Sequence, residues 1–128
     1  FLTYAAKVLD VHPTRLMELA AEADKSVPVS SYCSVFAESE LLEQLRDGAT
    51  REQIALGALE SVAERILEIG HLAAPVVVTG GVPEYFPGVA AALESRSGLP
   101  IRMAPEPIQA ASLGAALMAL EMDPGVGI

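Results

Sequence analysis

The sequence predicts an α/β protein in which a helical part, residues 1–72, is followed by a partial α/β part, residues 73–128. Before residue 70 the apolar residues recur at the three- and four-residue spacing of helices. After it come two short apolar runs, at 75–79 and 99–103, each followed by helix-like sequence. This alternation with short links predicts a right-handed parallel crossover. Because two strands do not make a stable sheet alone, we expect further strands from sequence outside this chain or from another chain.

Composition narrows the classes of function. The chain has 128 residues, of which 52% are apolar, enough for the core of one modest domain or of a piece of a larger one. A net charge of −9 with only 8 Lys and Arg argues against a nucleic-acid partner or an anionic membrane surface. No apolar run approaches the roughly 18 residues of a membrane span. A single cysteine makes no internal disulfide, so we expect a cytoplasmic protein.

The chain begins without a methionine and directly in helix-like sequence, which predicts a cut within a domain. A first helix is expected over residues 1–9. It is broken at His12, and Pro13 suits the first position of a second helix. A polar link and a short extended segment at 27–29 follow. We interpret His12, and His71 after a later helix, as boundary residues rather than ligands.

The stretch around the single cysteine is the most distinctive of the first part. Cys33 lies at the start of an expected helix that runs to about Arg46, with serines at positions 30, 31 and 34 available as N-caps. A thiol in the first turn lies at the positive end of the peptide dipoles, which favours the metal-ligating thiolate. A lone cysteine is, however, more often a small buried apolar group. The residues alone leave both interpretations open.

The following helix has a clear beginning and end. Thr50 and Gln53 form a capping box, in which the Thr50 side chain bonds the N3 amide and Gln53 reaches back to the N-cap. We expect the helix to end at Gly70. Its apolar side is expected to comprise Ile54, Ala58, Val62, Ile66 and Ile69.

The second part begins with a β-branched run at 75–79 that lacks polar alternation, which is typical of a strand covered on both faces. A turn region at 83–87, a helix ending at Gly98, a second strand at 99–103 and a last helix from Gln109 are expected next. The last helix should reach about Met122 and pack closely on a strand. Its inward residues are expected to be Leu113, Ala116, Leu117 and Leu120.

Gly80 and Gly81 directly follow the first strand. In open α/β sheets ligands bind beyond the carboxyl ends of the strands, and two glycines leave no side chain between the backbone and such a ligand. The alternative is a tight strand-to-helix turn, and the residues alone favour neither. The chain contains neither a P-loop nor a Gly-x-Gly-x-x-Gly fingerprint.

Three strings together resemble one protein family. They are Cys33-Ser34-Val35-Phe36-Ala37-Glu38-Ser39-Glu40, Val76-Val77-Val78-Thr79-Gly80-Gly81-Val82 and Ser112-Leu113-Gly114-Ala115-Ala116-Leu117. The family is that of the 2-hydroxyacyl-CoA dehydratase activators and benzoyl-CoA reductase ATP-binding subunits. The similarity runs across nearly the whole chain, and the string that begins at Cys33 is specific.

The resemblance implies the actin/Hsp70-like (ASKHA, ribonuclease H-like) ATPase fold, with this chain as its C-terminal half. It implies a protein that binds ATP or ADP with Mg²⁺ and drives a low-potential electron from a 4Fe-4S cluster into an acyl-CoA dehydratase or reductase partner. Two subunits would share the cluster as a homo- or heterodimer through the cysteine helix, with Cys33 as one ligand. Gly80, Gly81, Val82 and Glu84 would line the adenosine side of the nucleotide cleft.

Part of that machinery is expected to lie outside this chain. In the family, the second cluster cysteine of each subunit stands in a Cys-x-x-Gly-Thr-Gly-Arg stretch just before the Phe-Leu with which this chain begins. Because a 4Fe-4S cluster normally needs four thiolates, two copies of this chain are not expected to hold one. No catalytic residue is expected in the chain, and it should not hydrolyse ATP alone, because the phosphate loops belong to the other half.

The sequence departs from the family after the first strand. The family commonly reads Gly-Gly-Val-Ala-x-Asn, whereas this chain has Gly80-Gly81-Val82-Pro83-Glu84-Tyr85. We therefore expect the usual adenosine contacts to differ here. Tyr85 or Phe86 either stacks on adenine or packs against the protein. Two alternative functions remain. One is a cluster-free kinase-type or regulatory nucleotide-binding protein of the same fold. The other is a non-enzymatic interaction module in which Cys33 is buried and the glycines form only a turn.

Overall fold

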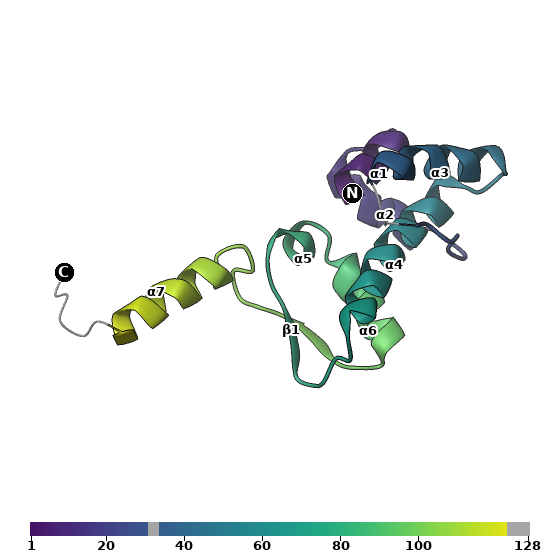
Figure 1. The fold of residues 1–128 in the computed structure, drawn as a ribbon. Coiled ribbons are helices and arrows are strands. Elements are labelled where there is room, and N and C mark those ends of the chain that lie inside the picture. Colours follow the sequence, from purple (N-terminus) through teal and green to yellow (C-terminus); the bar gives the residue numbers. More distant parts are fainter. Residues whose placement is uncertain (31–33, 123–128) are drawn as a thin grey trace.

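The structure is a computed structural model that describes residues 1–30 and 34–122. A cluster of helices at the N-terminal end leads through the long helix α4 into a small sheet with its own helices, and α7 extends away from both (Figure 1). The helical part and the strand–helix–strand–helix order of the second part are confirmed. The domain boundary at residue 72 stays a prediction.

The first helices are short and pack by their apolar faces. Helix α1 spans Leu2–Val8, a 3-10 turn spans Pro13–Arg15, and α2 spans Leu16–Ala21. His12 caps the 3-10 turn, because its Nδ1 accepts a hydrogen bond from the backbone N–H of Thr14 at 3.4 Å. The interpretation of His12 as a boundary residue is therefore confirmed.

Helix α4, Arg51–Ile69, is the central element of the fold. It packs against α2 and α1 on the N-terminal side and against α6, Gly88–Ser97, on the other. Helix α3, Ser34–Arg46, buries Ala37 and Leu41 but leaves Phe36 72% exposed. The core residues with the largest fully buried side chains are Leu9, Leu16, Leu41, Ile54 and Leu93.

The predicted capping box at the start of α4 is confirmed. The Thr50 hydroxyl accepts from the N–H of Gln53 at 3.3 Å, and Gln53 Oε1 accepts from the N–H of Thr50 at 3.3 Å. Gln53 Nε2 also donates to Asp24 at 2.7 Å, which lowers the pKa of that carboxyl. The cap therefore joins α4 to the link after α2.

We expect Thr50→Ala to lower the free energy of unfolding of the chain by about 1 kcal/mol, because the N-terminal N–H groups of α4 lose their side-chain acceptor. Thr50→Ser keeps the hydroxyl and should be close to the unaltered chain. Urea denaturation followed by circular dichroism measures both. Equal stability of the alanine and serine variants would contradict this role of the cap.

The sheet has two parallel strands in the described part of the chain. Strand β1, Val76–Val78, pairs with β2, Ile101–Met103, with Val77 opposite Arg102. The short helix α5, Gly81–Tyr85, and α6 form the crossover, and α6 ends at Gly98 with a φ of 68°. The parallel crossover is confirmed. The expected turn at 83–87 is wrong in part, because α5 continues into it as helix.

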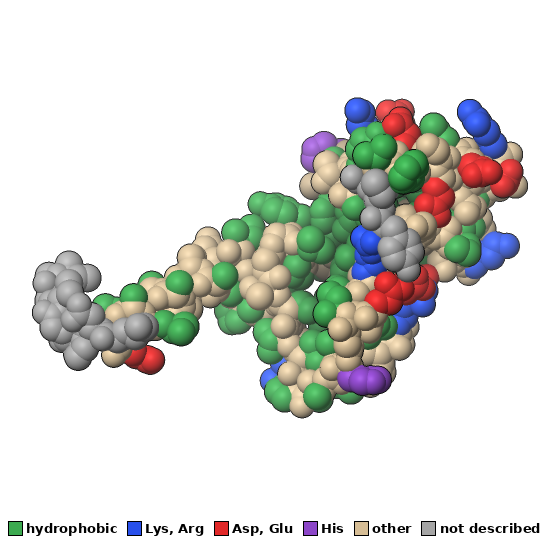
Figure 2. All heavy atoms as spheres, in the orientation of Figure 1, with side chains coloured by type: hydrophobic (Ala, Val, Ile, Leu, Met, Phe, Trp, Pro, Cys, Tyr) green, Lys and Arg blue, Asp and Glu red, His purple; other side chains and the backbone are tan. Residues whose placement is uncertain are grey.

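Two expectations about burial are wrong. Val77 is 56% exposed, so β1 is not covered on both faces. The last helix forms as predicted, as α7 over Ala110–Met122, but Leu113, Ala116, Leu117 and Leu120 are exposed rather than inward. The physical reason is the same in both cases. Within the described residues the sheet consists of β1 and β2, so no layer covers the outer face of β1 or α7 (Figure 1). Figure 2 accordingly shows hydrophobic side chains on the surface of the α7 extension.

Candidate functional site

The turn after β1 is held by the loop that leads into α7. Gly80 donates its backbone N–H to the carbonyl of Pro107 at 2.8 Å, and the Thr79 hydroxyl donates to the same carbonyl at 2.7 Å. Gly80 has a φ of 95°, a conformation that side chains other than glycine rarely adopt. The turn is therefore a defined structure, and its first glycine is required by the backbone.

The space above this turn is open. A Cβ on Gly80 would meet nothing within 4 Å, and one on Gly81 would meet only the ring of Tyr85, at 3.8 Å. The turn lies at the carboxyl end of a parallel strand, where α/β proteins place ligands. The backbone of both glycines can therefore be approached closely, and their role in ligand binding stays a prediction.

Helix α5 presents the remaining predicted residues beside the glycines. Val82, Glu84 and Tyr85 are exposed, whereas Pro83 is buried. Phe86 is only 8% exposed and belongs to the hydrophobic core. The structure thus brings Gly80, Gly81, Val82 and Glu84 into one turn and its short helix. Of the two aromatic residues, Phe86 packs inward and Tyr85 does not.

A pocket of about 400 Å³ lies behind the turn, between β1, α4, α5 and α6. The residues that line it are Val62, Ile66, Val78, Thr79, Val82, Pro83, Val89, Ala90 and Leu93. Thr79 is the one polar side chain among them, and its hydroxyl is already bonded to Pro107. The pocket therefore offers an apolar surface and no cation for a phosphate group.

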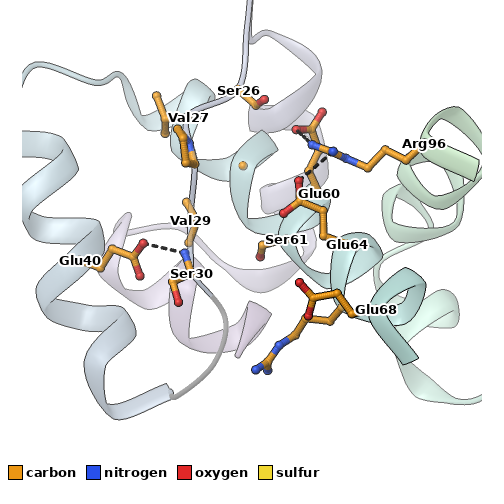
Figure 3. Close-up of a pocket in the computed structure, with 13 residues that line it drawn as sticks. Ser26, Val27, Val29, Ser30, Glu40, Glu60, Ser61, Glu64, Glu68 and Arg96 are labelled. Atoms are coloured by element: carbon orange, nitrogen blue, oxygen red, sulfur yellow. Dashed lines mark hydrogen bonds and ion pairs between the residues drawn. The ribbon is translucent and has the colours of Figure 1, made fainter. Parts of the chain in front are cut away.

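Cys33 lies outside the described residues, but residues 28–30, which precede it, are hydrogen-bonded to α3. The backbone N–H of Ser30 donates to Glu40 of α3 at 2.6 Å (Figure 3), and Gln44 of α3 donates to the carbonyl of Pro28 at 3.1 Å. Val29 is buried between them. The segment before Cys33 is thus tied to the helix that begins immediately after it. Sequence reasoning gave Glu40 no such anchoring role.

The same segment packs tightly on α4. At Gly57 a Cβ atom would lie 2.1 Å from the carbonyl oxygen of Val27, so only glycine fits. Around this contact is a pocket of about 410 Å³ with charged walls (Figure 3). Arg96 of α6 crosses it to pair with Glu60 and Glu64 of α4, each at 2.8 Å. These pairs join α4 to α6, and we assign the pocket a structural role.

The residues of this chain do not by themselves fit an iron–sulfur cluster. Among residues 1–30 and 34–122, no three or more His, Cys, Asp or Glu side chains are grouped as a metal site. Cys33 is the single cysteine of the chain, and a 4Fe-4S cluster takes four thiolates.

Within residues 1–30 and 34–122, no helix is long and apolar enough to cross a membrane.

Solved structures identify the class of fold. The chain resembles component A of the (R)-2-hydroxyglutaryl-CoA dehydratase of Acidaminococcus fermentans, with a TM-score of 0.83 and 39% identity over 95% of the chain. It resembles the activator of the 2-hydroxyisocaproyl-CoA dehydratase from Clostridium difficile with bound ADPNP, with a TM-score of 0.79 and 32% identity, again over 95% of the chain. It covers 48% and 46% of those two chains. The fold is therefore part of an actin-like ATPase fold, as predicted.

Sequence comparison then gives the family. Residues 1–119 match the BadF/BadG/BcrA/BcrD ATPase family, and the chain belongs to this family. It is 40% identical over 122 residues to the (R)-2-hydroxyglutaryl-CoA dehydratase activating ATPase of Acidaminococcus fermentans, covering 93% of this chain and 46% of the relative. It is 40% identical over 124 residues to the activator of lactoyl-CoA dehydratase of Anaerotignum propionicum, covering 94% and 48%. The chain thus spans about half the length of these relatives.

Proposed function

We propose that this chain is the C-terminal portion of an ATP-hydrolysing protein that activates a 2-hydroxyacyl-CoA dehydratase by electron transfer. In the complete protein, the Gly80–Gly81 turn receives the nucleoside side of ATP or ADP, with Mg²⁺ and the phosphates held by the other half. Cys33 supplies one ligand of a 4Fe-4S cluster shared between two subunits. The alternative that the family resemblance implies is that the complete protein drives benzoyl-CoA reduction.

The observation that carries the proposal is the likeness to a dehydratase activator solved with bound ADPNP, which extends over 95% of this chain. The two 40%-identical relatives are likewise named for dehydratase activation. The turn geometry supports the nucleotide part. It is open at the carboxyl end of β1, and its glycines let a ligand approach the backbone.

The charge at the turn supports a nucleoside rather than a phosphate at this place. Between Thr79 and Gly88 the single charged residue is Glu84, a carboxylate that repels phosphate but can accept hydrogen bonds from ribose hydroxyls. Gly80 has already given its N–H to Pro107, so it does not contribute to an anion-binding cradle. The phosphates therefore point away from this turn.

The cysteine segment supports the cluster part of the proposal. The Ser30–Glu40 and Gln44–Pro28 hydrogen bonds tie residues 28–30 to α3, which begins one residue after Cys33. A cluster ligand is best supplied from a segment whose neighbouring residues are anchored, because metal–thiolate geometry is narrow. One thiolate per chain requires further ligands from the rest of the protein and from a second subunit.

We expect Gly81→Val to weaken ADP binding by the complete protein at least tenfold while the protein still folds. The added Cβ meets only the Tyr85 ring at an ordinary contact distance, but the side chain occupies the open space above the turn. Isothermal titration with ADP measures the effect, thermal unfolding checks the fold, and Gly81→Ala should give an intermediate loss. Unchanged ADP affinity in the valine variant would refute nucleotide binding at this turn.

A further inference from the structure

We propose that the ring of Tyr85 stacks on the base of the nucleotide at the Gly80–Gly81 turn and makes the site prefer a purine. The inference rests on the proposed function, since it needs a nucleotide at the turn. It goes further, because it assigns base recognition to one side chain of this turn.

The position of Tyr85 is the first support. It is the last residue of α5 and is 63% exposed. Its ring atoms Cδ2 and Cε2 lie 3.8 Å from the place of a Cβ on Gly81, so the ring stands beside the bare backbone of the turn. Next to it the space at Gly80 is empty to 4 Å. The ring of Tyr85 and the open position at Gly80 therefore both lie next to Gly81.

The second support is that the neighbouring aromatic ring is already engaged. Phe86 is 8% exposed and packs in the hydrophobic core with Leu59 and Val89. Tyr85 is therefore the aromatic side chain at this turn that a ligand can reach. When a planar apolar group covers a solvent-exposed aromatic ring, the free energy of the system falls.

The third support is electrostatic. The single charge of the 79–88 segment is the carboxylate of Glu84, one residue before Tyr85. A carboxylate here disfavours the phosphate end of a nucleotide and is compatible with a neutral base and its ribose. A base stacks on an aromatic side chain through its π-face, and the two rings of a purine cover more of Tyr85 than the one ring of a pyrimidine.

The test is nucleotide binding by the complete protein carrying Tyr85→Ala, with Tyr85→Phe as the matched control. We expect the alanine variant to bind ADP roughly 5- to 150-fold more weakly, the loss of one base–aromatic stack. The phenylalanine variant keeps the ring and should bind like the unaltered protein. Because Tyr85 is exposed, both variants should retain the thermal unfolding temperature.

Two further ligands distinguish a loss of base stacking from a general loss of nucleotide binding. Inorganic tripolyphosphate has no base, so its affinity should not change in Tyr85→Ala. The ratio of ADP to UDP affinity should fall toward one in that variant. If the unaltered protein binds ADP but Tyr85→Ala binds it equally well, the stacking role is overturned while the proposed function stands. If the unaltered protein binds no ADP, both are overturned.

Discussion

Gly57→Ala is expected to destabilise the chain by about 3 kcal/mol, the upper end of the cost of overpacking a filled interior. The new Cβ would lie 2.1 Å from the carbonyl oxygen of Val27 and 3.1 Å from a methyl carbon of Val29. The first of these atoms is backbone, so a rotamer change cannot relieve the clash. Either α4 or the segment before Cys33 must move. Urea denaturation of the variant measures the loss.

The control for this substitution is Gly114→Ala, which changes the same residue type within another helix. A Cβ on Gly114 of α7 meets nothing within 4 Å. Alanine is the better helix former, so this variant should be unchanged or more stable by about 0.5–1 kcal/mol. If Gly57→Ala were as stable as Gly114→Ala, the close packing of α4 on the 27–29 segment would be refuted.

Local chemistry explains which elements could be predicted from the sequence. The start of α4 follows from Thr50 and Gln53, whose side chains satisfy N–H groups wherever such a helix begins. The end of α6 follows from Gly98, which takes the left-handed conformation. The parallel pairing of β1 and β2 follows from the strand–helix–strand order, because an intervening helix returns the chain to the same end of the sheet. The two helix ends need only residues close in the sequence, and the pairing needs only the order of the elements.

Burial depends on partners that lie far away in the sequence, and it was predicted less well. Leu113 and Leu117 were expected inward because α7 is apolar, but an apolar helix with no facing layer stays exposed. Val77 was expected to be covered for the same reason. The anchoring of Ser30 by Glu40 was also missed, because it joins residues on opposite sides of Cys33. The close fit of Gly57 against Val27 left no signal beyond one glycine within a helix.

In the candidate site, too, local features could be predicted and burial could not. The glycine turn could be predicted, because Gly80 and Gly81 follow a β-branched run directly. Which of Tyr85 and Phe86 faces the turn could not be predicted, because the helical register of α5 decides which ring is buried. That register turns Phe86 into the core and leaves Tyr85 beside the turn. Cys33 lies outside the described residues, so its role as a ligand stays a prediction.

The proposed role of Cys33 as a cluster ligand predicts that Cys33→Ser in the complete protein abolishes cluster binding and leaves a folded dimer. Serine keeps the size and the hydrogen-bonding capacity of the side chain, but its hydroxyl is not deprotonated at neutral pH and is a poor iron ligand. A cluster shared by two subunits would lose one ligand from each. Anaerobic reconstitution followed by iron and sulfide analysis measures the loss, and size-exclusion chromatography measures the dimer.

The matched control is Ser39→Ala, an exposed position of α3 that should leave the iron content unchanged. The two substitutions together separate ligation from any general effect on α3. The anchoring of the preceding segment by Glu40 and Gln44 does not involve the thiol, so the protein should keep its fold when the thiol is lost. A Cys33→Ser protein with the full iron content would remove Cys33 from the ligand set. It would leave a cluster-free nucleotide-binding protein of the same family as the better interpretation.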